Sequence, residues 1–312
     1  MALTRDEASA RGGAVDRLRP VVTGIWPGAS VATHGSTPAD LALPTSDVDC
    51  VITGLASPDK GGSPEGRRDS ALEALAEDIR DSNFARHIQV YPSARVPIAR
   101  YMDTVSRVNI DVCLGGGPDA GPTAGDVAGW LTALPDLRPL LIVLKAYLYK
   151  WRLEGGFKGG PGSHALLVMV AAFLVDWQGQ GHYDALLAFI DVYGLRPEAV
   201  GNSLRAGEPI AFPEHNNSSW AGLHKDPRDV HVKLDPMFNQ KRVWEAFSNF
   251  RSALTTPDCP WEAAGSSLLP RIFWAGDSVV GERVLPGLVG AAVAGAATPV
   301  ALPGQEQRLH PE

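Results

Sequence analysis

Two acidic residues separated by a single residue, Asp47 and Asp49, place the strongest constraint on how this chain can fold. Residues 47–53 alternate between polar and apolar side chains, which is typical of a strand with one buried face. On such a strand both carboxylates project from one side, while Val48 and Cys50 project from the other. The pair is therefore either part of a solvated sheet face or close enough to share cations.

Two further features favour a cation site around this pair. Gly35-Ser36, separated from Asp47 by ten residues, predicts a turn whose N–H groups and hydroxyl can approach a phosphate, where a bulkier residue than glycine would block access. Asp111, in a predicted strand at residues 108–114, supplies a third carboxylate. Such an oxygen-rich site suits Mg²⁺ or Mn²⁺. Two of these ions about 4 Å apart can activate a ribose 3′-hydroxyl and stabilise a leaving pyrophosphate, so the pattern predicts nucleotidyl transfer.

The chain changes character near residue 117. Its length of 312 residues exceeds the usual limit for one core, so we expect two domains. These are a mixed α/β catalytic domain at residues 13–117 and a helical domain at residues 118–254, followed by a loosely structured tail at residues 255–312. The predicted fold class is α+β, with a twisted mixed sheet that carries the aspartates. Helices are expected at residues 14–26, 70–82, 137–151, 165–177 and 240–254, and strands at residues 30–33, 47–53, 88–91, 96–101 and 108–114.

A family resemblance rests on two strings. Residues 34–50, HGSTPADLALPTSDVDC, closely resemble the nucleotidyltransferase signature of the Trf-type poly(A) polymerases, which belong to the DNA-polymerase-β-like superfamily and include the catalytic subunit of the TRAMP complex. Residues 142–148 and 159–166, IVLKAYL and GGPGSHAL, look like the family's Lys-bearing helix and Gly-Gly-x-x-Ser-Tyr turn. The resemblance implies a polymerase-β-like nucleotidyltransferase domain joined to a helical central domain of the poly(A)-polymerase-associated type.

The resemblance also implies individual roles. The catalytic residues and ligands of two Mg²⁺ or Mn²⁺ ions would be Asp47, Asp49 and Asp111. The implied nucleotide-binding residues are Gly35, Ser36, Lys145, Ser163, His164 and Asp226. Lys145 lies on the polar side of an apolar helix, which fits a phosphate contact; the alternative is a plain surface lysine. Ser163 is expected to cap a buried helix, where open N–H groups form an anion site.

The base-reading part of the family pattern is altered in this chain. His164 stands where the family usually has a tyrosine that stacks on the incoming base, and a histidine hydrogen-bonded at a domain junction explains it equally well. The family's recognition loop carries Asp-Pro followed by two asparagines. Its best counterpart starts at Asp226 without those asparagines, and Asp235-Pro236 offers a competing alignment. Related uridylyltransferases use a histidine in this loop, so His224 or His231 leaves the choice between ATP and UTP open.

The implied activity is template-independent addition of AMP from ATP to the 3′ end of RNA, in RNA processing or decay. One alternative is an RNA uridylyltransferase that uses UTP. Another is a catalytically silent scaffold that binds RNA or protein, although all three acids are present. The formal net charge of −7 argues against RNA binding through a broad basic surface, and no RNA-binding module is visible. We therefore expect an RNA-binding protein partner.

Composition also bears on the compartment. No run of about eighteen apolar residues is present, so no membrane span is expected. The three cysteines form no CxxC pair, which argues against a disulfide framework or a zinc site and favours a reducing compartment. The resemblance implies a nuclear location, with a cytoplasmic one as the alternative, although no basic cluster in the chain supports nuclear import.

Overall fold

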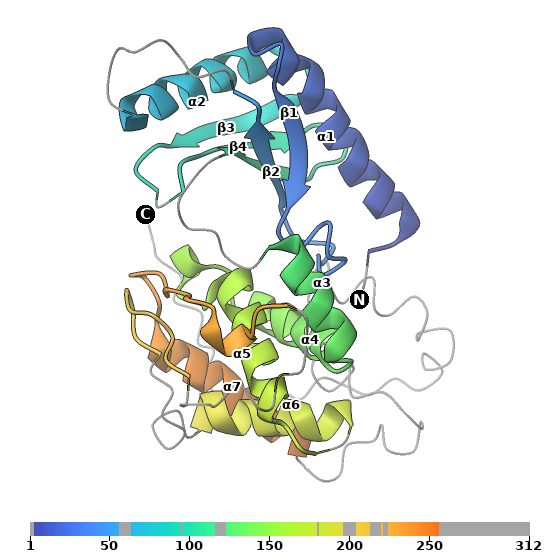
Figure 1. The fold of residues 1–312 in the computed structure, drawn as a ribbon, viewed down its shortest axis with the longest axis vertical. Helices are drawn as coiled ribbons and strands as arrows, with labels where there is room; N and C mark the ends of the chain where they lie inside the picture. Colours follow the sequence, from blue (N-terminus) through green and yellow to red (C-terminus); the bar gives the residue numbers. More distant parts are fainter. Residues whose placement is uncertain are drawn as a thin grey trace, which may run out of the picture.

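The protein has an α/β part and a helical part that face one another (Figure 1). This computed structural model describes residues 3–255 except for 56–63, 95, 116–122, 180, 196–203, 213–219 and 221–223. The tail expected at residues 255–312 lies outside the described residues from position 256 onward. Within the described residues, no single helix is both long and apolar enough to cross a membrane; α3 and α4, described below, reach that composition only together and meet at 110°.

A five-stranded mixed sheet forms the centre of the α/β part, with strand order β1-β2-β5-β4-β3. The strands are β1 (Ser30–His34), β2 (Val48–Thr53), β3 (Ala85–Tyr91), β4 (Ile98–Asp103) and β5 (Asn109–Leu114). The β2 and β5 strands run parallel, and the other neighbours run antiparallel. All five predicted strands are confirmed, with shifts of up to three residues at their ends. Because β2 pairs directly with β5, the two predicted acidic strands lie side by side.

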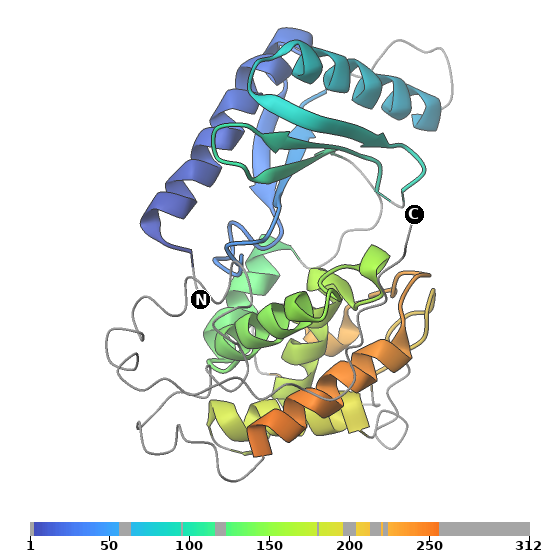
Figure 2. The same cartoon turned by 180° about the vertical axis from the view of Figure 1, so that it is seen from behind.

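Two helices, α1 (Arg5–Ile25) and α2 (Pro64–Asp81), pack on one face of this sheet (Figure 2). The α1 helix begins well before the expected residue 14. Thr4 caps it through a capping box, in which its hydroxyl accepts from Glu7 N–H while the Glu7 carboxylate accepts from Thr4 N–H. The helix continues through Gly12 and Gly13, both poor helix formers, so the expected domain start at residue 13 falls inside α1.

The helical part begins with α3 (Ala124–Ala133) and α4 (Leu137–Lys150), and continues with α5 (Gly162–Asp176) and α6 (His182–Ile190) to α7 (Gln240–Thr255). Among the described residues, short helical turns lie between them at η1 (Gly156–Lys158), the π-helical η2 (Asp191–Leu195) and η4 (Pro227–Asp229). The helices expected from residues 137, 165 and 240 are confirmed. The α5 helix is buried nearly all round, as its uniformly apolar sequence predicts.

Two hydrophobic clusters support a two-domain division. One joins the sheet to α1 and α2, and the other joins the helices of the second part. Leu41 and Leu43, from the connection between β1 and β2, belong to the helical cluster although both flanking strands belong to the sheet. We propose the domain boundary in the connection between β5 and α3, with the connection from β1 to β2 as the main bridge between the two cores.

Candidate active site

Three aspartates gather on the open face of the sheet. Asp49 on β2 and Asp111 on β5 are direct register partners, and Asp47 immediately precedes β2. Val48 and Cys50 are buried in the core while Asp49 is only partly buried, as the alternation predicts. Burial, with the neighbouring carboxylates of Asp111 and Asp47, raises the pKa of Asp49 to about 7. Burial also raises the pKa of Asp47, so the cluster is electrostatically suited to positive charge.

Gly35 forms the turn that faces this cluster. Its φ of +69° lies in the left-handed region, where residues with a side chain are strained. A Cβ at this position would also lie 2.8 Å from Asp49 Oδ2. The carbonyl of the adjacent Ser36 accepts from Leu41 N–H at 2.9 Å, which closes the turn. Glycine is therefore required both by the backbone and by the close approach of the turn to the carboxylate.

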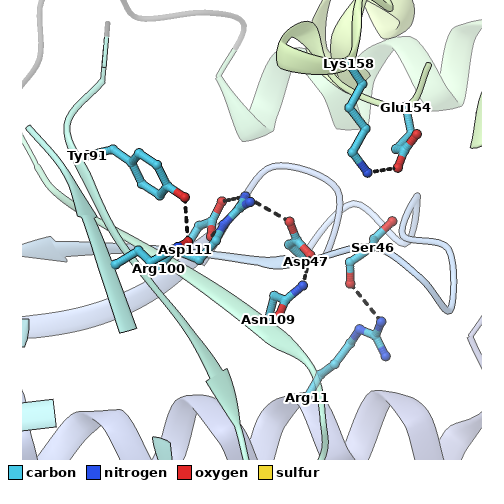
Figure 3. Close-up of polar contacts among 10 residues, drawn as sticks. Arg11, Ser46, Asp47, Tyr91, Arg100, Asn109, Asp111, Glu154 and Lys158 are labelled. Atoms are coloured by element: carbon cyan, nitrogen blue, oxygen red, sulfur yellow. Dashed lines mark hydrogen bonds and ion pairs between the residues drawn. The ribbon is translucent and has the colours of Figure 1, made fainter. Parts of the chain in front are cut away.

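A guanidinium that sequence reasoning missed holds two of the carboxylates. Arg100 on β4 donates from Nε to Asp111 Oδ1 at 2.6 Å and from one terminal nitrogen to Asp111 Oδ2 at 2.5 Å (Figure 3). The same nitrogen donates to Asp47 Oδ2 at 3.1 Å, while Asn109 donates to Asp47 Oδ1 at 3.1 Å. Arg100 is the register partner of Asp111. The alternation of residues 96–101 indicates its exposed face, but not which residue of the neighbouring strand it meets.

The backbone just before Asp47 is held from α1. Arg11 is only 4% exposed, and one of its terminal nitrogens donates to the carbonyls of Leu43, Pro44 and Ser46, the closest at 2.8 Å. Burial lowers the pKa of this guanidinium, and the nearby Asp47 opposes that shift. Arg11 is thus a positioning residue for the entry into β2 that sequence reasoning also missed.

The same connection is held from α4. Lys145 is 7% exposed, and its ammonium donates to Leu41 C=O at 2.8 Å. Burial lowers the pKa of Lys145 to about 8, against the attraction of Asp49, so it is not a plain surface lysine. Arg138, further up α4, forms an ion pair with Asp40. These contacts attach the helical domain directly to the connection between β1 and β2.

The predicted turn before α5 lies on the helical side of the site. The helix begins at Gly162 after Pro161, so Ser163 stands in the first turn and the expectation that it caps the helix is wrong. Both Ser163 and His164 are exposed there, next to the N–H groups that a first turn leaves open. From the neighbouring η1 turn, Lys158 points toward the aspartates and pairs with Glu154 (Figure 3).

Asp226 is not brought to this turn. Its carboxylate accepts from the backbone N–H of Arg228 at 2.9 Å and from the guanidinium at 3.0 and 2.7 Å. Arg228 also donates to Asp176, the last residue of α5, at 2.7 Å. Because a helix rises 1.5 Å per residue, this end of α5 lies about 20 Å from Ser163. The carboxylate of Asp226 is therefore committed to a buried ion pair at the far end of the helix.

The competing Asp235-Pro236 segment lies beside the turn instead. A Cβ at Gly156 would lie 2.7 Å from Asp235 Cβ, so the Asp235 side chain packs against the Gly156 backbone. Asn239 N–H donates to Gly159 C=O at 2.9 Å. This placement favours Asp235-Pro236 over Asp226 as the counterpart of the family's recognition loop, with Asn239 beside the same turn.

In the described part of the chain, no three or more His, Cys, Asp or Glu side chains are arranged so that they could hold a metal ion together. The contacts above give the reason, since Arg100 and Asn109 engage both oxygens of Asp47 and Arg100 engages both oxygens of Asp111. The donor atoms are nevertheless all carboxylate oxygens from adjacent strands. Carboxylate oxygens are the ligands that hard divalent cations prefer, whereas thiolates and imidazoles suit softer metals.

Known proteins resemble this chain both in the sheet and beyond it. Residues 1–116 match the family model described as the central palm domain of mitochondrial-like poly(A) RNA polymerases. Over these residues the chain is therefore similar to that palm domain. The matched residues include Asp47, Asp49 and Asp111, and the relatives confirm the resemblance to Trf-type poly(A) polymerases.

Sequence and structural relatives extend beyond the palm domain. The chain is 29% identical over 278 residues to Poly(A) RNA polymerase protein 2 of Saccharomyces cerevisiae, which covers 81% of this chain and 45% of that protein. The polymerase core of TRAMP, an RNA surveillance complex, superposes with a TM-score of 0.58 at 22% identity over 87% of each chain. A structure of mtPAP with ATPγS gives 0.60 at 12% identity, covering 86% of this chain and 66% of that one. The α+β polymerase-β-like fold is thereby confirmed. The chain spans less than half the length of the yeast relative.

Proposed function

We propose that this chain is a template-independent nucleotidyltransferase that adds AMP from ATP to the 3′ end of RNA. The observation that carries the proposal is the meeting of Asp47, Asp49 and Asp111 beside the Gly35 turn of a palm domain. The family of the palm domain supports RNA tailing, because its model and the yeast relative are both named for poly(A) RNA polymerases.

Two divalent cations, Mg²⁺ or Mn²⁺, fit the proposed site. The three aspartates would hold them, since burial and the neighbouring carboxylates penalise the charged form of Asp49, and a cation relieves that penalty. When bound, such a pair of ions supplies activation of the attacking hydroxyl and stabilisation of the leaving pyrophosphate. Metal ions of this kind also complete the charge balance with a triphosphate.

The chain's own residues would bind and orient the nucleotide. The Gly35 turn leaves room for a phosphate next to Asp49, and Ser36 adds a hydroxyl at the same point. On the opposite wall, Lys145 contributes an ammonium and Ser163 lies in the first turn of α5, where open N–H groups favour an anion. His164 follows Ser163 on the exposed side, and we propose that its imidazole stacks on the base. The site thus positions the α-phosphate between the aspartates and the cationic wall.

The direct test offers each of the four nucleoside triphosphates to the purified protein with a labelled single-stranded RNA and Mg²⁺ or Mn²⁺. Extension with ATP in preference to UTP is the expected result, read as a ladder on a denaturing gel. Efficient use of UTP with poor use of ATP would identify a uridylyltransferase instead. RNA binding without extension by any nucleotide, with either metal, would identify a silent scaffold.

Lys145 provides a second test of the nucleotide site. Lys145→Met is expected to raise the KM for ATP by about tenfold, because a buried charge-assisted contact is lost. In the unaltered protein the KM should also rise between pH 7 and 9, since Lys145 loses its charge as the pH passes its pKa of about 8. Steady-state rates across this pH range measure both effects.

Two variants control the Lys145 experiment. Lys145→Arg keeps its charge throughout the range, so its KM should not follow the same rise. Lys241→Met removes a charge from an exposed position on α7 and should leave the KM unchanged. An unaltered KM in Lys145→Met would contradict a contact between Lys145 and the nucleotide.

We also propose that an RNA-binding protein partner supplies much of the affinity for RNA, because the chain carries a formal net charge of −7. In support, the structurally similar TRAMP core is part of a complex. A nuclear location remains a prediction from the resemblance alone, and tagged protein in intact cells would test it.

A further inference from the structure

Arg100 occupies the carboxylate oxygens that a divalent cation would need. Its guanidinium engages both oxygens of Asp111 and one oxygen of Asp47, with distances from 2.5 to 3.1 Å. The remaining oxygen of Asp47 accepts from Asn109. Asp49, the third acid, has the strongly raised pKa, and among the described residues Arg100 donates hydrogen bonds to Asp111 and Asp47 but not to Asp49. Arg100 therefore neutralises Asp111 and Asp47 by direct contact but does not contact Asp49.

A guanidinium and a metal ion cannot share these oxygens in this arrangement. Mg²⁺ approaches its oxygen ligands to about 2.1 Å and demands near-octahedral geometry. A second cation on the same lone pairs would stand within a few ångströms of the guanidinium, where like charges repel strongly. Binding of a divalent cation by Asp47 and Asp111 thus requires that Arg100 give up at least one of its contacts.

The contacts also indicate which one is given up. The bond from Arg100 to Asp47 is single and the longest of the three, at 3.1 Å, while Asp111 receives a two-pronged fork from the neighbouring strand. Forked pairs of this kind are the stronger ones. The side chain of Arg100 is 37% exposed and that of Asp47 33%, against 12% for Asp111. Asp47 is therefore the partner that can separate without burying an unpaired charge.

We propose that Arg100 is a resident counter-cation of the aspartate cluster, which competes with divalent metal for Asp47 and Asp111 and releases Asp47 when metal binds. In this role Arg100 is a positioning residue. It keeps the acidic strands together before the nucleotide arrives and sets a threshold that a metal–nucleotide complex overcomes more readily than a metal ion alone. The inference rests on the proposed function only for the identity of the competing cation.

The test is a direct metal titration of the full chain without nucleotide. Mn²⁺ affinity is measured by isothermal titration calorimetry and by water-proton relaxation for the unaltered protein and for Arg100→Gln. The variant should bind Mn²⁺ about two- to fivefold more tightly, in line with the modest strength of partly exposed ion pairs. Equal or weaker binding by Arg100→Gln would overturn the proposal, because it would make Arg100 a support of the metal ligands and not their competitor.

Two matched variants sharpen the titration. Arg86→Gln removes the same charge from an exposed position of β3, one strand away from Arg100, and should bind Mn²⁺ as the unaltered protein does. Arg100→Lys keeps the charge but cannot form the fork, so its affinity should lie between the other two. If Arg86→Gln bound Mn²⁺ as tightly as Arg100→Gln does, the gain in affinity would be explained by net charge alone, which would contradict the proposal.

A measurement on the unaltered protein covers the case in which Arg100→Gln fails to fold. In protein labelled with ¹⁵N-arginine, the Nε–H signal absent from Arg100→Lys belongs to Arg100. Mg²⁺ with a non-hydrolysable ATP analogue should shift this signal, and the Arg86 signal should stay in place. An Arg100 signal that does not move at saturating Mg²⁺ would overturn the proposal.

The outcome is separable from that of the proposed function. Tighter Mn²⁺ binding by Arg100→Gln in a protein that extends no RNA would support the counter-cation and reject the tailing activity. RNA extension by the unaltered protein, together with an Mn²⁺ affinity that is unchanged in Arg100→Gln, would support the tailing activity and reject the counter-cation.

Discussion

Replacing both Asp47 and Asp49 by alanine is expected to abolish nucleotide addition, with a loss of at least about a thousandfold in kcat/KM. The two carboxylates lie on one face beside the Gly35 turn, and Asp111 alone cannot hold two cations. Extension of a labelled RNA under single-turnover conditions provides the measurement. Asp78→Asn, at an exposed position on α2, is the matched control and should retain full activity. Extension at the normal rate by the double variant would show that the site lies elsewhere.

The same variant should stay folded, which separates lost chemistry from lost structure. Asp49 has a folded pKa of about 7, above its ordinary value of 3.8. The folded protein therefore holds this proton where the unfolded chain has released it, and the metal-free protein should lose stability as pH rises from about 4 to about 7, by on the order of 2–4 kcal/mol. Removing the carboxylate removes that loss. Thermal unfolding in a chelator at pH 5 and pH 8 should show a smaller pH effect in the variant.

The second large effect is expected at Asp226. Its side chain is 4% exposed and that of Arg228 is 2% exposed, so Asp226→Ala leaves a buried guanidinium with Asp176 alone. Breaking a buried ion pair in this way costs about 3–5 kcal/mol. The melting temperature should fall by about 10 °C, while the KM for ATP of the folded fraction should not change.

Asp235→Ala is the matched comparison for Asp226→Ala. Asp235 is only partly buried and its carboxylate accepts from Met237 N–H at 2.8 Å, so its loss should cost less than about 1 kcal/mol. Because its loop touches Gly156 near Ser163, we expect the KM for ATP to rise instead. The opposite pattern, a stable Asp226→Ala with a raised KM, would assign base reading to the Asp226 loop and contradict the placement described above.

The acidic strands were predictable because a strand has a period of two, so Asp47 and Asp49 had to share a face whatever the strand paired with. The pairing itself was not. Arg100 meets Asp111 only because β4 lies antiparallel to β5 in one register, and neither strand order nor register is written in the alternation of either strand. Residue-level prediction succeeded where the constraint was local and failed where it came from a distant strand.

Two other positions where the structure differs from the sequence-based expectation have separate causes. The helix was predicted only from residue 14, where the apolar residues at helical spacing begin, and the Thr4–Glu7 capping box that starts α1 was overlooked. Asp226 was selected because Asp-Pro dipeptides look alike, and only packing shows that one of the two lies under Arg228 while the other lies beside Gly156. A dipeptide motif identifies a turn, but the tertiary contacts of the turn decide what it faces.

The connection between β1 and β2 has a consequence for recombination among relatives. Its ends belong to the sheet, but Leu41 and Leu43 are packed in the helical core. Lys145 and Arg138 of α4 also donate hydrogen bonds to its backbone carbonyls. A palm domain transplanted without a compatible α4 would lose the partner that shapes its own active-site connection. An exchange of domains between such proteins should therefore preserve the site only when this connection and α4 come from the same parent. The segments that must be kept together belong to both hydrophobic cores.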